Sequence, residues 1–278
     1  MDLVLQGPTV AASDIAAFAS LTGAQGIHAL EGGAPAYRLT RVERQEGVAE
    51  RCAEAGLDHA FVPADLTRDR VRVVAMDMDS TLITIECIDE IADMVGIKHE
   101  VAAITAAAMR GELKFAESLA RRVALLAGLP VRELERVYVE RLRLSPGAER
   151  MLREFRAAGA KTLLVSGGFT FFTDRLAERL GFDETAANTL DIIGDKLTGR
   201  VLPPIVDGEI KAARLAAMRK RYAGENEVVV AIGDGANDIP MLAPADVSVA
   251  YRAKPIVRAR ATYAIDQCGL DAVLNLFR

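Results

Sequence analysis

Three short apolar runs, each ending in acidic, hydroxyl or glycine residues, constrain this chain most. The runs are VRVVAMDMD (71–79), AKTLLVSGG (160–168) and EVVVAIGDGAND (227–238). Continuous β-branched runs of this length are typical of strands that are buried on both faces of a parallel sheet. Helices are expected around 146–158, with Ser145 as cap and Pro146 in the first turn, and around 173–180 and 209–222. The pattern predicts a doubly wound, mostly parallel α/β sheet with its ligand site beyond the carboxyl ends of the strands.

The segment between Leu82 and Ser145 interrupts this alternation, because it holds no convincing strand. A structureless loop of that length is improbable inside a compact domain. Four helices are expected instead, around 88–95, 99–109, 115–126 and 131–142, separated by Gly96, Gly111 and the turn 128–130. We therefore expect a helical cap inserted directly after the first acidic strand.

The first 67 residues have a different pattern of short alternating elements. Strands are expected at 3–6, 24–30, 36–42 and 59–62, with helices at 13–21, capped by Ser13, and at 45–55. This β-α-β-β-α-β order is the ferredoxin-like arrangement. The expected division is a small ferredoxin-like α+β N-terminal domain (1–67), a catalytic core (68–82 and 145–278) and the helical cap (83–144).

Composition and charge exclude several classes of partner. The 278 residues carry 34 Lys+Arg and 39 Asp+Glu, a formal charge of −5, without the basic stripe that nucleic-acid binding needs. No apolar run reaches the ~20 residues that span a bilayer, and the N-terminus lacks the basic region of a signal peptide. Cys52, Cys87 and Cys268 are odd in number and far apart, so we expect reduced thiols and a cytoplasmic location.

Pairs of aspartates end the first and third runs. Asp77 and Asp79 are two residues apart, and side chains at i and i+2 of an extended strand point to the same side. Asp234 and Asp238 belong to the GDGAND sequence that ends the third run. Adjacent carboxylates repel each other unless a cation neutralises them or one keeps its proton. Four carboxylates at converging strand ends predict a Mg²⁺ site, because this ion prefers hard oxygen ligands and shares a phosphate.

The second run predicts an anion site at the same edge of the sheet. Ser166-Gly167-Gly168 offers a small hydroxyl followed by unobstructed backbone N–H groups. Lys211 is expected near the start of a helix, where the helix dipole does not favour a cation, and this misfit suggests a role toward an anion. The chain has neither a GxxxxGK[ST] sequence nor a GxSxG elbow, so neither a P-loop nor a serine triad is expected.

The order of DxDST, SGG, a lone lysine and GDGAND resembles the haloacid dehalogenase superfamily of aspartyl-phosphate phosphatases. Three segments are similar to the phosphoserine phosphatases in particular, namely 77–82, Glu86 with 88–92, and 109–123. The resemblance covers about residues 71 to 270 and implies a haloacid dehalogenase-like core. One departure is Met78, where the family often has Phe between the two aspartates. The region 1–67 resembles an ACT-like small-ligand or dimerisation module.

The resemblance implies a division of labour among these residues. Asp77 is the expected nucleophile that becomes an aspartyl phosphate, and Asp79 is the expected general acid and then general base. Mg²⁺ is expected on the Asp77 carboxylate, the Asp79 backbone carbonyl and Asp234, with Asp238 just outside these ligands or orienting Lys211. The groups expected to bind the phosphate are Ser166, the Gly167 N–H, Lys211 and Asn237.

Substrate choice is expected to come from the cap. By resemblance, Glu86 binds the substrate ammonium, Arg122 binds its carboxylate and Phe115 closes the pocket. Phe115 and Arg122 are seven residues apart on one expected helix, so they share a face. Arg121 carries the same charge, and helical phase together with the family pattern has to decide between the two arginines.

The resulting expectation is a Mg²⁺-dependent phosphatase that hydrolyses L-phosphoserine to L-serine and phosphate, the last step of serine biosynthesis. One alternative changes the substrate to another small phosphomonoester, or transfers the phosphoryl group to a homoserine-like acceptor. A second alternative is a serine-sensing regulatory protein with an inactive phosphatase body, and the intact set of charged and hydroxyl residues argues against it. The expected partner is a small-molecule substrate, with no nucleic acid and no membrane, and a homodimer is a further option.

Overall fold

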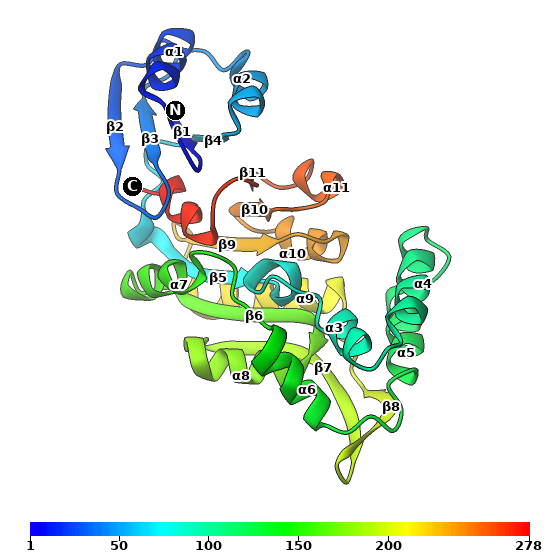
Figure 1. Cartoon of the computed structure of the whole chain (residues 1–278). Helices are drawn as coiled ribbons and strands as arrows, with labels where there is room; N and C mark the ends of the chain where they lie inside the picture. The colour runs from blue at the N-terminus through cyan, green and yellow to red at the C-terminus, as the bar shows by residue number, and fades with distance from the viewer.

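The computed structural model describes all 278 residues, which form a seven-stranded sheet and a smaller four-stranded sheet (Figure 1). The large sheet has the strand order β11-β10-β9-β5-β6-β7-β8. Its strands are β5 (Val71–Met76), β6 (Lys161–Phe169), β7 (Glu184–Ile193), β8 (Lys196–Leu202), β9 (Val228–Gly233), β10 (Val247–Tyr251) and β11 (Tyr263–Ile265). Neighbouring strands are parallel except β7 and β8. The predicted doubly wound, mostly parallel α/β fold is confirmed.

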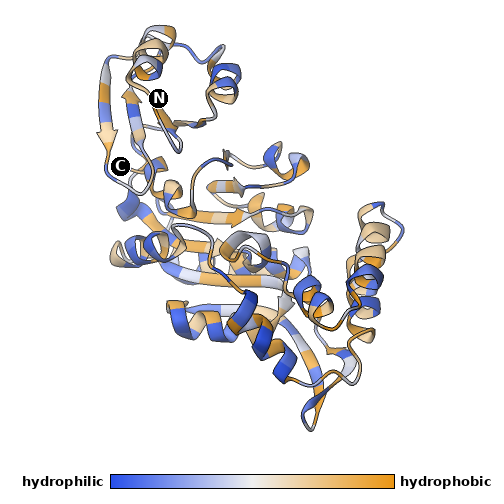
Figure 2. Ribbon diagram, in the orientation of Figure 1, coloured by the Kyte–Doolittle hydropathy of each residue, from blue (hydrophilic) through white to orange (hydrophobic).

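Helices cover both faces of the large sheet. One face packs against α9 (Gly208–Tyr222), α10 (Ile239–Leu242) and α11 (Pro255–Arg258). The other face packs against α7 (Ala148–Ala157), α8 (Thr170–Leu180) and the 3-10 turn η5 (Leu270–Leu276). Alternate residues of β5 face the two layers, Val73 and Ala75 on one side and Val74 and Met76 on the other, and all four are completely buried. Figure 2 shows the apolar residues concentrated on the strands between these layers.

A helical segment lies between β5 and β6. It contains the π-type turn η2 (Met78–Leu82), α3 (Cys87–Met94), α4 (Lys98–Met109), α5 (Phe115–Ala124), α6 (Arg132–Arg136) and a second π-type turn, η3 (Val137–Arg141). The four expected helices are present, and the last one widens into η3 after its first turns. In Figure 1, α4 and α5 lie side by side and project beyond the carboxyl edge of the large sheet.

The small sheet is formed by the N-terminal residues. Its elements are β1 (Asp2–Gln6), α1 (Ala12–Thr22), β2 (Gly26–Leu30), β3 (Ala36–Thr40), α2 (Val48–Ala55) and β4 (Asp58–Val62), followed by the 3-10 turn η1 (Arg68–Arg70). The strand order is β2-β3-β1-β4, and every pair is antiparallel. This is the order that the ferredoxin-like β-α-β-β-α-β prediction requires.

Buried polar contacts attach the small sheet to the C-terminal end of the chain. The Asp58 carboxylate accepts the backbone N–H groups of three consecutive residues, 266–268, at distances of 2.8 to 3.1 Å. The Arg38 guanidinium donates to the carbonyls of Asn275 at 2.8 Å and Phe277 at 3.0 Å. Asp58 and Arg38 are both buried, so the small sheet is fixed against the large one without a continuous strand ladder.

Two predicted helix caps are wrong. Helix α1 begins one residue before Ser13, so this serine lies inside the first turn and makes no capping hydrogen bond. Helix α7 begins after Gly147, whose φ of 78° only glycine adopts at low cost, rather than at Ser145 and Pro146. The Ser145 hydroxyl donates instead to the Thr81 carbonyl at 2.6 Å. This hydrogen bond therefore connects the end of the helical segment to its beginning.

Four strands of the large sheet were not predicted from the sequence. Strands β7 and β8 form an antiparallel hairpin at the edge of the sheet, where burial is uneven and no continuous apolar run develops. Strand β10 has only five residues, although all are buried, and β11 has only three. Their pairing with longer neighbours, rather than their own sequence pattern, makes them strands.

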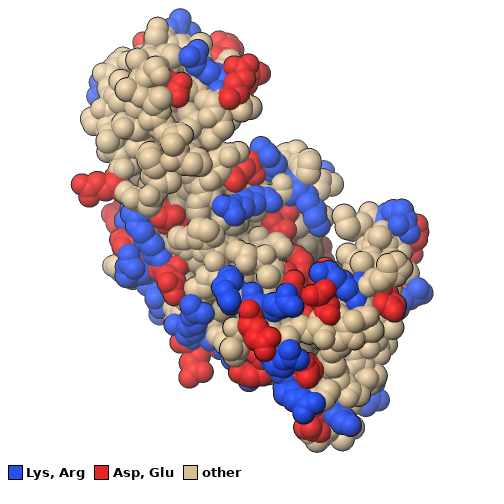
Figure 3. Space-filling model, viewed as in Figure 1, with Lys and Arg blue, Asp and Glu red and all other residues tan.

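No helix combines the length and apolar character needed to cross a bilayer. On the face drawn in Figure 3, basic and acidic side chains are interspersed over the large-sheet region.

Candidate active site

The first acidic residue of the site lies at a sharp turn after β5. The strand ends at Met76, and in the turn η2 that follows, Ser80 has a φ of 54°, a strained value for a non-glycine residue. Asp77 and Asp79 would share one face only if the strand stayed extended, and this condition is not met, because the chain turns directly after Asp77. The Asp77 carboxylate accepts the Met78 N–H at 2.7 Å, which fixes its orientation at the carboxyl edge of the sheet.

Asp79 lies in the same turn and has an unusual proton affinity. Its carboxylate accepts the N–H of Cys87, at the start of α3, at 3.0 Å. Burial, and next the negative charge of Glu86, raise the pKa of Asp79 to about 7. A carboxyl group with this pKa is present in both protonation states near neutral pH, so it can both give and accept a proton.

Lys211 is a completely buried cation of the site. Its ammonium lies 2.8 Å from Asp77 Oδ1 and 2.7 Å from Asp238 Oδ1, and the side chain is completely buried. The second oxygen of Asp238 accepts the N–H groups of Asp234 at 3.1 Å and Gly235 at 2.9 Å. Asp238 is thus fully hydrogen-bonded and holds the lysine beside Asp77.

The acids of this site outnumber its buried cation. Burial alone would lower the pKa of Lys211, but the charges of Asp238 and Asp77 outweigh it and raise the pKa. Burial, and next the charge of Asp238, raise the pKa of Asp77 well above its usual range, although Lys211 opposes this. The same two causes raise the pKa of Asp234 to about 6. Lys211 alone therefore does not neutralise the carboxylates that converge here.

The donor set fits a hard divalent cation. Carboxylate oxygens of Asp77, Asp234 and Asp238 all lie within 4.8 Å of one another. Carboxylate oxygens grouped in this way suit Mg²⁺ and similar ions, and Lys211 compensates only part of the negative charge of the three groups. The Asp79 carboxylate is not part of this group.

Two polar neighbours complete the acidic edge. Asn237 is half-buried in the short 3-10 turn η4 (Ala236–Asp238), next to Asp238. The completely buried Thr81 donates its hydroxyl to Asp234 Oδ1 at 3.0 Å and so fixes the position of that carboxylate. The sequence shows Thr81 only as part of the DxDST motif, and its role becomes visible when the fold brings η2 next to the end of β9.

Ser166 lies where β6 loses its regular pairing. The register with β7 shifts between Val165 and Phe169, which frees the intervening residues from the ladder. The Ser166 hydroxyl accepts the Gly168 N–H at 2.8 Å. A Cβ on Gly168 would lie 2.6 Å from Asp79 Oδ2 and 3.0 Å from Ser166 Oγ. Ser166 and Asp79 therefore border the same narrow space.

Asn188 supports this loop and was missed from the sequence. It is completely buried in β7, and its amide donates to the Gly167 carbonyl at 2.8 Å and accepts the Val206 N–H at 2.8 Å. Val206 directly precedes Asp207, whose carboxylate caps α9 by accepting the Ile210 N–H at 3.0 Å. Asn188 thus joins the serine loop to the start of the lysine helix. A lone amide in the stretch TAANTLDII was the available signal.

Phe115 and Glu86 bring the helical segment over the site. A Cβ on Gly167 would lie 2.9 Å from the Phe115 ring, so the ring covers this glycine directly. Glu86 is exposed at the mouth and accepts the Ser80 hydroxyl at 2.7 Å. The surrounding protein raises the pKa of Glu86 by desolvation.

Helical phase distinguishes the two neighbouring arginines of α5. Arg121 is exposed and pairs with Glu117, one turn away, at 2.7 Å. Arg122 is half-buried, and burial lowers its pKa while the charges of Asp89 and Glu86 oppose this. Arg122 therefore faces the acids of the site and Arg121 faces solvent.

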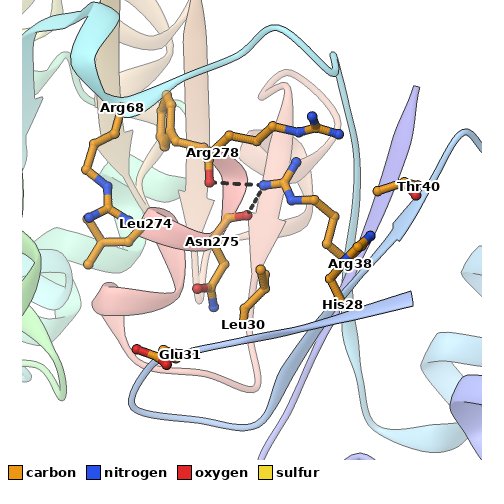
Figure 4. A pocket seen from close by; sticks show the side chains of 10 residues that line it. His28, Leu30, Glu31, Arg38, Thr40, Arg68, Leu274, Asn275 and Arg278 are labelled. Carbon is orange, nitrogen blue, oxygen red and sulfur yellow. Dashed lines mark hydrogen bonds between the residues drawn. The ribbon is translucent and has the colours of Figure 1, made fainter. Parts of the chain in front are cut away.

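A separate cavity of about 440 Å³ lies away from these residues, between the small sheet and η5 (Figure 4). Its most deeply buried cation, Arg38, already donates to two backbone carbonyls, and Arg278 pairs with Asp2 at 2.6 Å. The residues that line the cavity are His28, Leu30, Glu31, Arg38, Thr40, Arg68, Leu274, Asn275, Phe277 and Arg278. The converging acids, rather than this cavity, mark the candidate active site.

Comparison with known families agrees with this geometry. Residues 74–243 match the model of the haloacid dehalogenase-like hydrolases. Residues 3–51 match a domain of unknown function, DUF4072, so the ACT-like assignment of the N-terminal region stays a prediction.

Individual relatives extend the match. A phosphoserine phosphatase of Polaromonas sp. is 51% identical over 219 residues, which are 77% of this chain and 93% of that protein. The unliganded structure of a probable phosphoserine phosphatase from Vibrio cholerae has a TM-score of 0.86 at 35% identity, over 99% of this chain and 85% of that one. A phospho-aspartyl intermediate analogue of phosphoserine phosphatase has a TM-score of 0.69 at 37% identity, over 75% of this chain and 99% of that one. The chain therefore belongs to the haloacid dehalogenase-like hydrolases, and it is a phosphatase.

Proposed function

We propose that this phosphatase hydrolyses L-phosphoserine to L-serine and phosphate through an aspartyl phosphate on Asp77, as the last step of serine biosynthesis. The observation that carries the proposal is the grouping of Asp77, Lys211 and Asp79 at one edge of the sheet, with Glu86 and Arg122 facing them from the helical segment. The relatives named above are phosphoserine phosphatases, which supports the same substrate.

In the first step, an Asp77 oxygen attacks phosphorus and the bond from phosphorus to the serine oxygen breaks. Asp79, which is partly protonated near neutral pH because its pKa is about 7, gives its proton to the departing oxygen. Lys211, 2.8 Å from Asp77, screens the negative charge of the phosphate from the incoming carboxylate. Ser166 and the Gly167 N–H bind the phosphate oxygens, and Asn237 also reaches the phosphate.

In the second step, Asp79 accepts a proton from a water molecule whose oxygen attacks the phosphorus. The bond between Asp77 and phosphorus breaks, so that phosphate is released and the Asp77 carboxylate is restored. Asp79 can serve in both steps because its pKa lies close to the working pH.

A Mg²⁺ ion would be held by the Asp77 carboxylate, the Asp79 backbone carbonyl and Asp234. Asp238 would stay outside these ligands, because its oxygens are occupied by Lys211 and two backbone N–H groups. When bound, the ion supplies charge compensation for the transferred phosphoryl group. Thr81 keeps Asp234 oriented for this purpose through its hydrogen bond.

Residues 83–144 would act as a cap over the core formed by 68–82 and 145–278, and Phe115 would close the pocket against Gly167. Glu86 would bind the substrate ammonium and Arg122 its carboxylate. Both residues come from this segment, so the cap would select the amino-acid part of the substrate while the core binds the phosphate.

The test is a measurement of phosphate release with Mg²⁺ from L-phosphoserine, D-phosphoserine, phosphothreonine and p-nitrophenyl phosphate. We expect the highest kcat/KM for L-phosphoserine. When the reaction is stopped rapidly with acid, we expect the phosphoryl group on Asp77. Equal kcat/KM for all four compounds would contradict the proposed substrate, and a phosphoryl group on another residue would contradict the proposed mechanism. Formation of a phosphorylated product from added homoserine would favour a phosphotransferase.

A further inference from the structure

A fourth strand ends at the carboxyl edge that carries the acidic site. Strand β10 pairs in parallel with β9, so its end at Tyr251 lies beside the end of β9 and the loop of Asp234. The next residue, Arg252, has a φ of 47°, which is rare and strained outside glycine. This turn redirects the chain toward Lys254. A strained turn at a ligand-binding edge is where a functional side chain is expected.

The backbone of Lys254 is firmly held. Its N–H donates to the Asp234 carbonyl at 3.2 Å, and its own carbonyl accepts the N–H groups of Val257 at 2.9 Å and Arg258 at 3.1 Å. Pro255 follows directly and limits the conformations that Lys254 can adopt. The base of the lysine side chain is therefore fixed against the loop that carries Asp234.

The side chain of Lys254, in contrast, is free. It is exposed and makes neither an ion pair nor a side-chain hydrogen bond. The backbone hydrogen bond to the Asp234 carbonyl keeps the base of this side chain at the edge of the sheet that carries the acids, and the ammonium is paired to none of them. Its positive charge also partly opposes the rise in the pKa of Glu86 that burial causes.

Lys254 differs in this respect from the other cations of the site. Lys211 is completely buried and already paired with two aspartates. Arg122 approaches Glu86 from α5, whereas Lys254 approaches it from the sheet, and both charges act on the Glu86 carboxylate. One cation from the helical segment and one from the core are therefore within electrostatic range of Glu86.

We propose that Lys254 is a substrate-binding residue whose ammonium, together with Arg122, binds the carboxylate of the substrate. This inference rests on the proposed function, because it needs a substrate with an amino-acid head group. In such a head group the ammonium pairs with Glu86, and the adjacent carboxylate pairs with cations that lie close to that acid. Because Lys254 and Arg122 come from different parts of the fold, a carboxylate between them also links the helical segment to the core.

The test compares the Lys254→Met variant with the wild type on two substrates. L-phosphoserine and phosphoethanolamine share the phosphate and the ammonium, but only phosphoserine has a carboxylate. We expect Lys254→Met to lower kcat/KM for phosphoserine about tenfold, mainly through KM, and to change kcat/KM for phosphoethanolamine less than about twofold. Lys254→Arg should recover most of the loss, because it keeps the charge.

Lys220→Met is the matched control, because Lys220 is exposed on α9 and makes no ion pair. It should leave kcat/KM for both substrates unchanged. An equal loss of kcat/KM on both substrates would overturn the proposal, since Lys254 would then contact the phosphate or the Asp234 loop. An unchanged kcat/KM on both substrates would also overturn it. Wild-type protein that fails to hydrolyse phosphoserine would contradict the proposed function itself, which separates the two failures.

Discussion

Asp238 holds the Lys211 ammonium at 2.7 Å in an ion pair from which solvent is completely excluded. A buried pair of this kind gives little net stability, but the loss of one partner leaves an uncompensated charge in the interior. The second oxygen of Asp238 is fixed by two backbone N–H groups, so the aspartate cannot move away from the lysine. The pair therefore serves to keep a positive charge beside Asp77.

The Asp238→Asn substitution should lower the free energy of unfolding by about 3 kcal/mol, because Lys211 keeps only Asp77 as a partner. Urea denaturation of the metal-free protein measures the change. Glu117→Gln is the control, because Glu117 forms an exposed pair with Arg121, and it should cost about 0.5 kcal/mol or less. Equal losses for the two variants would mean that the buried pair is no more important to stability than a surface pair.

The Asp77→Asn substitution should abolish turnover and leave the fold intact. Asparagine has nearly the same shape, and Lys211 still pairs with Asp238, so no buried charge is left without a partner. The amide is a far weaker nucleophile than the carboxylate. Phosphate release and the thermal unfolding midpoint are the two measurements. Normal activity in this variant would contradict the covalent mechanism.

The Gly168→Ala substitution should lower kcat about tenfold or more. The added Cβ would lie 2.6 Å from Asp79 Oδ2, so the carboxylate that exchanges protons has to move. Gly224→Ala is the control, because its nearest neighbour is the end of the Glu227 side chain at 3.5 Å. Steady-state kinetics on both variants would show whether the loss is specific to Gly168, and an unchanged kcat for Gly168→Ala would argue against a role for Asp79.

The placement of several residues at one edge of the sheet was predictable where a residue type and its strand position were enough. Asp77, Ser166 and Asp234 each follow an apolar run, and parallel strands bring their carboxyl ends to one edge whatever the details of the loops. The helical segment was predictable for a similar reason, because glycines separate its helices. These features depend on local pattern and on the general rules of parallel sheets.

The features of the site that the sequence did not predict depend on contacts between distant parts of the chain. Asn188 is a supporting residue only because β7 places its amide against Gly167, and β7 itself has no apolar run that predicts it. Lys254 reaches the site only through the turn at Arg252, whose positive φ no composition rule indicates. The turn after Asp77 was likewise missed, because its shape is set by packing and not by strand periodicity.

Stability of the metal-free protein should fall as the pH rises. The pKa of Asp234 is raised from 3.8 to about 6 and that of Asp79 from 3.8 to about 7. Below pH 3.8 both groups are protonated in the folded and unfolded states alike, and their favourable contribution is complete. As the pH passes 6 and then 7, the folded protein has to ionise them in a buried site, and that contribution is lost.

Mg²⁺ should reverse this loss, because it binds the ionised carboxylates. We expect the rise in thermal unfolding midpoint between EDTA and excess Mg²⁺ to be larger at pH 8 than at pH 5. Differential scanning fluorimetry at the two pH values measures it. A larger rise at pH 5 would contradict a cation site built on these acids.

Two adjacent arginines of α5, Arg121 and Arg122, serve as each other's control. Arg122→Ala should raise KM for phosphoserine about tenfold or more, since the half-buried guanidinium faces Glu86 and Asp89 and is the cation that α5 presents to the site. Arg121→Ala should leave KM unchanged, because Arg121 is exposed and pairs only with Glu117. The two variants remove the same side chain from the same helix, so a difference in helix propensity cannot separate them. Kinetics with phosphoserine that did not distinguish the variants would mean that helical phase does not select the substrate-binding arginine.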